Sequence, residues 1–392
     1  MRRRHLLPAA LSFVSATAIV VASVVAGDVE SVASAPAAIT TTTSTSTIVP
    51  TTTSTTAVPT TEALDGAWAA TPSPGSSCVM VAAGPKVLFE RNPDTPVTPA
   101  STMKLLTATT ALHELGATST LTTRVVRDGD DLYLVGDGDP LLTANDLGTL
   151  AEQVASSGVT SFGRVVGDES RFDSLRVVPT WPGRYSVRPL SALYATDTDD
   201  VVATFADHLR MRGVAVGATA MGVAPAGSAF VAAHDSPTIA SIVEQMLTTS
   251  NNVAAELLTK QIGDGTTAGG TAVTTSVLTE LGLPMDGVVI RDGSGLDRGD
   301  RVTCRLLTAI LARDDHVIDQ GLPVAAETGT LAARFHDTPV AGTLHAKTGS
   351  LYGVASLAGH ARGVTFAQVL NGFPSVQVAT AVQDLFAMAL VS

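Results

Sequence analysis

Two residues in the stretch PASTMKLL have side chains that can carry out nucleophilic chemistry. Ser101 and Lys104 lie three positions apart, and Lys104 is one of only four lysines in this chain of 392 residues. On a helix, residues at i and i+3 share one face, so the amine can reach the hydroxyl. A serine hydroxyl needs a neighbouring base, and burial among apolar neighbours lowers the pKa of a lysine enough for it to serve as one. The pair therefore predicts a serine nucleophile activated by a lysine.

Two further patterns follow Ser101-x-x-Lys104 in the chain, namely Ser250-Asn251-Asn252 and Lys347-Thr348-Gly349. A lone S-x-x-K is weak, since about one is expected by chance in a chain of this length. The ordered triple is stronger, because it contains two of the four lysines and each falls in the expected context, a helix start and a strand. This order of motifs is shared by penicillin-binding proteins and class A β-lactamases.

Each motif residue has a predicted chemical role. Ser101 attacks a carbonyl, Lys104 takes its proton, Ser250 relays a proton to the leaving amine, and Asn252 holds the lysine and the substrate backbone. Lys347 and Thr348 receive a carboxylate, and Gly349 lets a strand edge approach the substrate closely. The backbone N–H groups of Ser101 and Ser350 stabilise the oxyanion.

The elements that must position these residues can be read from the sequence. A hairpin is predicted over 78–91, and a helix carrying Ser101 and Lys104 ends at Gly116. Helices broken near Ser250 follow, then antiparallel strands containing the Lys-Thr-Gly motif and a final helix. We therefore predict an α/β (α+β) fold, an antiparallel sheet flanked by helices, with a small β-rich subdomain inserted at 121–195.

Beyond the triple, the chain resembles the penicillin-binding D-alanyl-D-alanine carboxypeptidases and endopeptidases of the S13 type, the DacB or penicillin-binding protein 4 family. The resemblance covers about 75–392 and is carried by KVLFERNPDTPVTPASTMKLLTA, LVGDGDPLL, VVGDESRFD, RDGSGLDRGDRVT and LPVAAETGTLAARFHDTPVAGTLHAKTGSL. Asn251 stands where the family usually has aspartate, and we expect this change to be tolerated.

The resemblance implies a serine β-lactamase/DD-peptidase-like fold, with the peptidase domain formed by 65–120 and 196–392. It implies that peptidoglycan stem peptides are the substrates and that β-lactam antibiotics are covalent inhibitors. Two alternatives stay open: a serine β-lactamase, which would need a deacylating glutamate such as Glu256 or Glu280, and a non-catalytic cell-wall-binding protein with a degenerate site.

No metal or cofactor is predicted. The aspartates between 128 and 139 do not have the spacing of an EF-hand and are typical of Asp-Gly turns. The sequence has no H-E-x-x-H zinc motif. The net charge of −12 argues against nucleic-acid binding.

The N-terminal region predicts export. Arg2, Arg3 and Arg4 precede an apolar run, so 1–35 is interpreted as a cleaved signal peptide or a retained membrane anchor. Residues 36–64 are rich in Thr, Ser and Pro and are predicted to be a disordered linker. We therefore expect an extracytoplasmic protein, wall-associated, secreted or anchored to the plasma membrane. Such a compartment permits a disulfide between Cys78 and Cys304, but the sequence leaves open whether they pair or are two small buried apolar residues.

Overall fold

The computed structural model describes residues 59–69, 71, 76–181, 183 and 187–392. The predictions for 1–35 and for most of the linker lie outside these residues. The predicted end of the linker at 64 is wrong, because helix α1 (Thr61–Ala69) begins within it. Leu64 is fully buried and α1 packs against the C-terminal helix α10 (Val376–Ala389). The apolar residues Leu64 and Trp68 lie one helical turn apart, which a composition argument overlooks.

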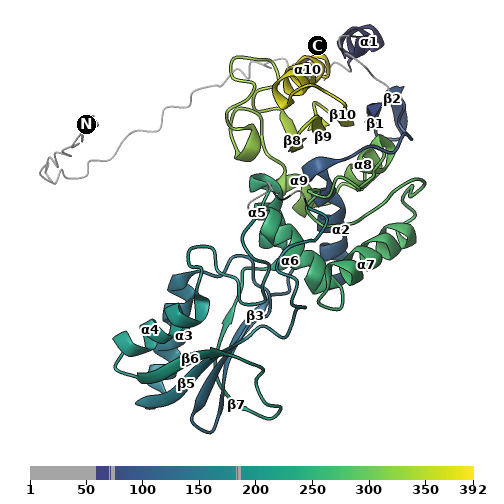
Figure 1. Cartoon of the computed structure of the whole chain (residues 1–392). Helices are drawn as coiled ribbons and strands as arrows, with labels where there is room; N and C mark the ends of the chain where they lie inside the picture. The colour runs from purple at the N-terminus through teal and green to yellow at the C-terminus, as the bar shows by residue number, and fades with distance from the viewer. Residues whose placement is uncertain (1–58, 70, 72–75, 182, 184–186) are drawn as a thin grey trace, which may run out of the picture. The chain divides into compact units, whose positions relative to one another are not determined.

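The first sheet is antiparallel, and Figure 1 shows its strands β8, β9 and β10 beneath α10. Its strand order is β2-β1-β10-β9-β8, with bounds Lys86–Arg91, Cys78–Ala83, Val364–Asn371, Val354–Ala361 and Leu344–Leu351. Helix α10 contacts β8 and β9, while α8 (Cys304–Leu311) contacts β1, β9 and β10. The predicted antiparallel sheet flanked by helices is therefore confirmed.

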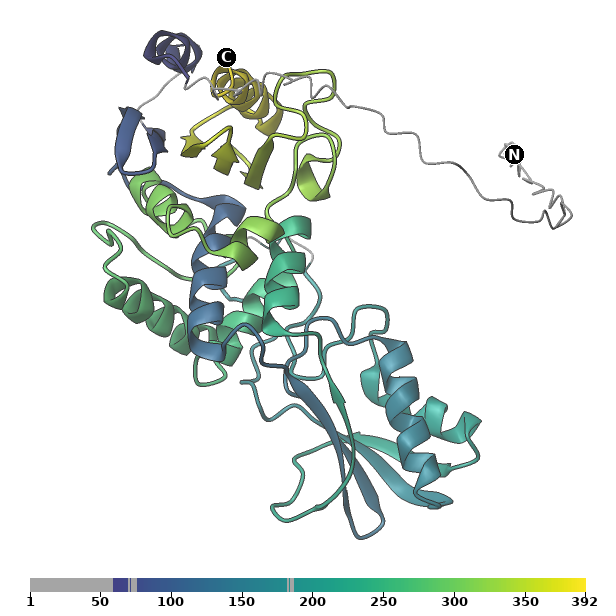
Figure 2. The same cartoon turned by 180° about the vertical axis from the view of Figure 1, so that it is seen from behind.

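A helical layer packs around α2 (Lys104–Leu115), which Figures 1 and 2 show among its helical neighbours. These neighbours are α5 (Ile239–Thr249), α6 (Asn252–Ile262), α7 (Thr267–Glu280), α8 and α9 (His316–Gly321). Helix α2 ends as predicted, since Gly116 adopts a φ of 80° as its cap. The break between α5 and α6 is at Ser250, which has a left-handed φ of 58°.

Asn251 caps the next helix. Its side-chain oxygen accepts a hydrogen bond from the Ala254 N–H, at 3.1 Å, and so satisfies a donor at the start of α6. Asparagine and aspartate serve about equally well at this position of a helix. The cap gives a physical reason to expect that Asn251 is tolerated where the family usually has aspartate.

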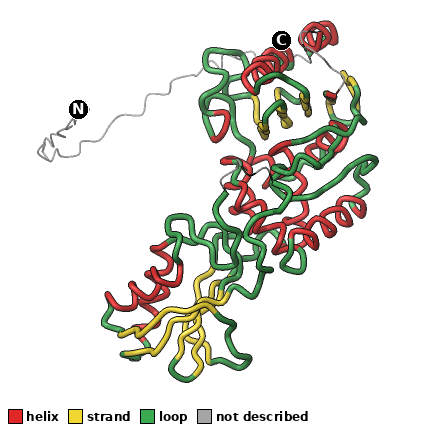
Figure 3. Tube along the Cα trace, viewed as in Figure 1, coloured by secondary structure: helices red, strands yellow, loops and turns green. Residues whose placement is uncertain are grey.

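The second sheet has the strand order β6-β5-β4-β3-β7, and Figure 3 shows its strands in yellow, apart from those of the first sheet. The bounds in that order are Ala215–Met221, Ser161–Asp168, Asp131–Val135, Thr122–Asp128 and Ala229–Asp235, and helices α3 (Ala144–Ser156) and α4 (Val201–Met211) accompany it. The predicted insert ends too early at 195, because β7 pairs with β3 and closes the sheet at Asp235. The insert is also α/β rather than mainly β, since α3 and α4 share its core.

A disulfide joins Cys78 of β1 to Cys304, the first residue of α8, with their Cα atoms 5.8 Å apart. This settles the alternative that the sequence left open. The bond ties the first sheet to the helix that covers it, across a sequence separation of 226 residues.

Candidate active site

Ser101 lies in a short 3₁₀ turn, Ala100–Met103, immediately before α2. The turn is backed by the loop that follows Arg291: any side chain at Gly295 would lie 1.9 Å from the Ala100 carbonyl oxygen. Ala100 itself is fully buried with a positive φ of 49°, a conformation that L-residues rarely adopt. Close packing therefore fixes the backbone that presents the Ser101 hydroxyl.

The structure brings Lys104 into contact with Ser101, as the sequence predicts. The Lys104 Nζ lies 3.0 Å from Ser101 Oγ, 2.7 Å from Asn252 Oδ1 and 2.7 Å from the Ser294 carbonyl oxygen. The lysine is completely buried. Burial disfavours the charged form and lowers the pKa of Lys104 to about 7, although the carboxylates of Asp292 and Glu256 oppose this shift. At neutral pH a large fraction of this lysine is therefore an uncharged amine able to accept a proton.

Lys347 on β8 contacts the second motif. Its Nζ donates to Ser250 Oγ at 2.9 Å and to the Thr348 carbonyl oxygen at 2.7 Å. It is completely buried, and burial together with the charge of Lys104 holds its pKa well below the usual value for a lysine. The three motifs are thus joined as two lysine–serine pairs.

Gly349 allows β8 to reach the nucleophile turn. A Cβ at this position would lie 2.8 Å from the Ser101 backbone nitrogen and 2.1 Å from Ser356 Oγ. Ser356 Oγ in turn donates to the Pro99 carbonyl oxygen at 2.6 Å. Only glycine lets the strand lie this close to the Ser101 N–H, which is one of the two predicted oxyanion donors.

A cavity of about 350 Å³ opens over these elements. It is lined by predicted residues from all three motifs, Ser101, Ser250, Thr348, Gly349 and Ser350, and also by Thr330, Arg334 and Thr380, which sequence reasoning missed. The Thr330 hydroxyl lies 2.7 Å from that of Thr348, and Arg334 pairs with Asp384 on α10. No short motif marks these residues, because they come from a loop and the C-terminal helix and meet β8 only in the folded chain.

Lys347 is not among the residues that line this cavity, although the sequence predicts that it receives a carboxylate. Its amine is directed at Ser250 from inside the protein. Of the cationic side chains in the described part of the chain, Arg334 is the one that lines the cavity wall.

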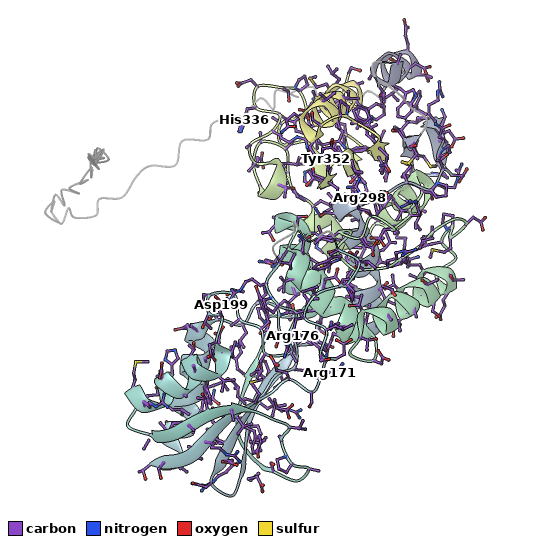
Figure 4. The ribbon with its side chains drawn as sticks, viewed as in Figure 1. Arg171, Arg176, Asp199, Arg298, His336 and Tyr352 are labelled. Atoms are coloured by element: carbon purple, nitrogen blue, oxygen red, sulfur yellow. A yellow bond between two sulfur atoms is a disulfide. The ribbon has the colours of Figure 1, made fainter. Side chains whose placement is uncertain are left out.

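The loop over 291–297 and residue Glu256 are further neighbours that the motifs do not reveal. Glu256 is buried on α6 and accepts hydrogen bonds from the backbone of this loop. The Ser294 carbonyl oxygen of the same loop accepts a hydrogen bond from the Lys104 amine. Beyond the loop, Arg298 donates to the Tyr352 carbonyl oxygen at 2.9 Å, next to the β8–β9 turn, and Figure 4 labels both residues. The spacing of Asn252, Glu256 and Lys260 at every fourth position places them on one face of α6, a signal that was readable in the sequence.

In the described residues, no group of three or more His, Cys, Asp or Glu side chains is placed to hold a metal ion.

Arg171, labelled in Figure 4, lies in the loop after β5. It donates a hydrogen bond to the Gln261 carbonyl oxygen on α6, at 3.2 Å, and so connects this loop to the helix. None of the described helices combines the length and apolarity needed to cross a bilayer.

Comparison with known proteins identifies a family match. The D-Ala-D-Ala carboxypeptidase 3 (S13) family model matches residues 62–185 and 182–390. The D-alanyl-D-alanine carboxypeptidase of Actinomadura sp. (strain R39) is 30% identical over 422 residues, which cover 77% of this chain and 78% of that protein. A carboxypeptidase of Mycobacterium tuberculosis is 31% identical over 340 residues, covering 72% of this chain and 73% of the relative.

A solved structure shares the fold. Penicillin-binding protein 4 (DacB) of Haemophilus influenzae superposes with a TM-score of 0.73 over 83% of this chain and 97% of its own, at 20% identity. The same protein has been solved in complex with a β-lactam. The likeness confirms the predicted β-lactamase/DD-peptidase-like fold.

Proposed function

Since this chain belongs to the D-Ala-D-Ala carboxypeptidase 3 (S13) family, we propose that its Ser101 is acylated by peptidoglycan stem peptides ending in D-Ala-D-Ala. The chain is a serine-type D-Ala-D-Ala carboxypeptidase/endopeptidase. The observation that carries the assignment of the nucleophile is the 3.0 Å contact between the Lys104 amine and the Ser101 hydroxyl, in a cavity shared with the other two motifs.

Acylation begins with the neutral Lys104 amine. As Ser101 Oγ attacks the penultimate D-alanine carbonyl carbon, its proton passes to Lys104 Nζ. The oxyanion that forms is stabilised by the N–H groups of Ser101 and Ser350, and removing one such donor typically costs about 2.7–4 kcal/mol. Ser101 and Ser350 both line the cavity, and the glycine before Ser350 lets β8 pack closely against the Ser101 nitrogen.

Collapse of the tetrahedral intermediate expels D-alanine, whose amine must gain a proton. Ser250 Oγ lines the cavity and accepts a hydrogen bond from Lys347 Nζ, so its own proton is free to point toward the leaving amine. The proton that Lys104 took from Ser101 replaces the one that Ser250 gives to the leaving amine, so both residues return to their starting states. Water then attacks the acyl-Ser101 ester as Lys104 accepts its proton, and that proton returns to Ser101 Oγ when the shortened peptide leaves.

The substrate carboxylate is received at the end of the cavity formed by Thr330, Arg334 and Thr348. Thr348 and Thr330 supply hydroxyl donors, and Arg334 supplies the positive charge that faces the cavity. This assigns to Arg334 the electrostatic role that the sequence gives to Lys347, and leaves Lys347 with the role of orienting Ser250.

A serine β-lactamase is the second candidate, and the same cavity argues against it. Fast deacylation needs a general base near the ester, and no acidic side chain is among the described residues that line the cavity. Glu256 is fully buried, with its Oε1 bound to backbone N–H groups, and Glu280 is exposed at the end of α7.

A fluorescent penicillin tests the proposal directly. The parent protein is expected to form a long-lived adduct on Ser101, and Ser101→Ala to form none, with Ser276→Ala on the exposed face of α7 as the matched control. Rapid turnover of the label would favour the β-lactamase, and no label on a folded parent would favour the non-catalytic protein. Chromatography of muropeptides incubated with the enzyme then measures D-alanine release.

Export and β-lactam sensitivity belong to the same proposal. Export is supported by the arginines at the start of the sequence and by the Cys78–Cys304 disulfide, since such bonds persist in oxidising compartments. Whether the N-terminal segment is a cleaved signal or a membrane anchor is tested by the N-terminal sequence of the protein purified from cells. Covalent inhibition by β-lactams is supported by the serine nucleophile and by the β-lactam complex of the Haemophilus influenzae protein, and the same label tests it.

A further inference from the structure

Three polar residues spaced four apart lie on one face of α6: Asn252, Glu256 and Lys260. Asn252 contacts Lys104, and Lys260 pairs with Asp173 in the loop after β5. Glu256 lies between them, completely buried, and the mechanism above does not use it. A buried carboxyl is costly unless it is hydrogen-bonded, so its contacts call for an explanation.

Glu256 binds the backbone of the loop behind Lys104. Its Oε1 accepts hydrogen bonds from the N–H groups of Gly293, at 3.0 Å, and Ser294, at 2.7 Å. Its Oε2 is buried and has no hydrogen-bond partner in the part of the chain that the structure describes. On the other side of the same residue, the Ser294 carbonyl accepts from Lys104 Nζ at 2.7 Å. One residue of backbone therefore connects the carboxyl group to the catalytic amine.

The position of that carbonyl decides where the lone pair of Lys104 points. A neutral amine has two N–H bonds and one lone pair, and the Ser294 carbonyl oxygen and Asn252 Oδ1 can only accept. When both N–H bonds point to these two oxygens, the lone pair remains for the third neighbour, Ser101 Oγ. Without the carbonyl, the amine is free to turn an N–H toward Ser101, and in that orientation it cannot take the serine proton.

We propose that Glu256 is a positioning residue for acylation, which holds the Ser294 carbonyl against Lys104 so that the amine's lone pair faces Ser101. The inference deepens the proposed function and rests on it. Close packing also holds the loop in place. A Cβ added at Gly293 would lie 1.9 Å from Thr259 Oγ1 on α6, and the Gly293 carbonyl oxygen accepts a hydrogen bond from Thr107 Oγ1 on α2 at 2.7 Å. Helices α2 and α6 thus clamp the loop, and Glu256 fixes the orientation of its peptide groups.

The charges around the pair give a second readout. Lys104 faces Asp292 and Glu256, whose negative charges raise its pKa against the effect of burial, and Lys347 is the other cation near it. Burial, then the charge of Asp292, raises the pKa of Glu256 to about 8, and burial raises that of Asp300, in the same loop region, to about 10. With a pKa of about 8, Glu256 is mostly the neutral acid where Lys104 titrates, so its hydrogen bonds to the loop, and not its charge, are its main influence on the amine.

The experiment compares two substitutions of Glu256 by the rate of acylation with fluorescent penicillin, measured from about pH 5 to about pH 9. Glu256→Ala removes the acceptor and is expected to lower the plateau rate about 100-fold, the scale expected for a misplaced catalytic group. Glu256→Gln keeps an oxygen acceptor and is neutral, as the protonated acid is, so its plateau is expected within about fivefold of the parent. The midpoint of the rise in rate on the acid side of the pH profile is expected to stay near that of the parent. Glu280→Gln, at the exposed end of α7, is the matched control.

The amount of protein labelled after long incubation, and the thermal midpoint, show that each variant is folded. A plateau in folded Glu256→Ala within twofold of the parent overturns the inference, as do equal plateau losses in the Ala and Gln variants. A midpoint that moves by more than about one pH unit in Glu256→Gln also contradicts it, because Glu256 would then act through its charge and not by holding the loop. If the parent itself is not labelled, the proposed function fails instead, so the two failures are distinct.

Discussion

The two lysines of the site are equally buried but lie in opposite surroundings. Lys104, on the helical side of the cavity, faces the carboxyl groups of Asp292 and Glu256, and its pKa falls to about 7. Lys347, on the strand side, has the cation of Lys104 as its charged neighbour, and burial together with that charge holds its pKa well below the usual value. The same residue type at the same burial thus has neighbouring charges of opposite sign.

The comparison shows that burial alone does not make a catalytic base. A base for acylation must lose its proton near neutral pH and regain it during the reaction, which requires desolvation to be partly balanced by nearby negative charge. Lys104 has that balance. Lys347 does not, and it orients Ser250 as a hydrogen-bond donor, a role that needs no change in its own charge.

The largest effect is expected from removing the amine on the helical side. Lys104→Met replaces the amine by an apolar group of similar length, and we expect acylation by fluorescent penicillin to slow by about 10³–10⁴-fold, the upper range for loss of a general base. Lys347→Met is expected to cost about 100-fold, because Ser250 remains but loses its orienting donor. Stopped-flow labelling measures both rates, and equal losses in two folded variants would show that the two sides do not differ in this way.

A smaller effect is expected at the mouth of the cavity. Arg334→Gln removes the cation that lines the cavity and should raise KM about tenfold for a peptide with a free terminal carboxylate, with little effect on the corresponding amide. Arg313→Gln, after α8 and exposed, is the control. Peptide hydrolysis followed by D-alanine release measures both substrates. If Lys347→Met raises KM for the free carboxylate more than for the amide and Arg334→Gln does not, the substrate carboxylate binds at Lys347 and not at Arg334.

The sequence predicts the helical side only in part. Ser101 and Lys104 are close because they lie three positions apart in a helical turn, and such local geometry follows from spacing. Their contact with Asn252 follows from the motif order. Ser294 and Glu256 were not predicted as partners of Lys104, because a backbone carbonyl has no motif and the contact depends on a loop that is distant in sequence.

The strand side shows the same limit. The Lys-Thr-Gly strand and its glycine were predicted, and Gly349 lies where only a glycine fits. Arg334 and Thr380 were missed, because Arg334 follows an irregular turn and Thr380 lies on α10, and only the packing of that helix over β8 and β9 brings them to the cavity. The insert's end was misplaced for a related reason: β7 returns to pair with β3 after a long excursion through two helices, and pairing between distant strands leaves no local signal.

The smallest expected effect concerns pH and separates the two lysines most sharply. Acylation needs the neutral form of Lys104, so the rate of the parent should be low in acid, rise through about pH 7 and level off above it. The pKa of Lys104 is set by burial and by the charges of Asp292 and Glu256, and Lys347 is not among these causes. Lys347→Met should therefore lower the plateau while leaving the midpoint of the acid limb within about 0.3 pH units of the parent. A midpoint that rises clearly in this variant would mean that Lys347 is charged in the resting enzyme and depresses the pKa of Lys104, which would make the two sides of the cavity one coupled unit.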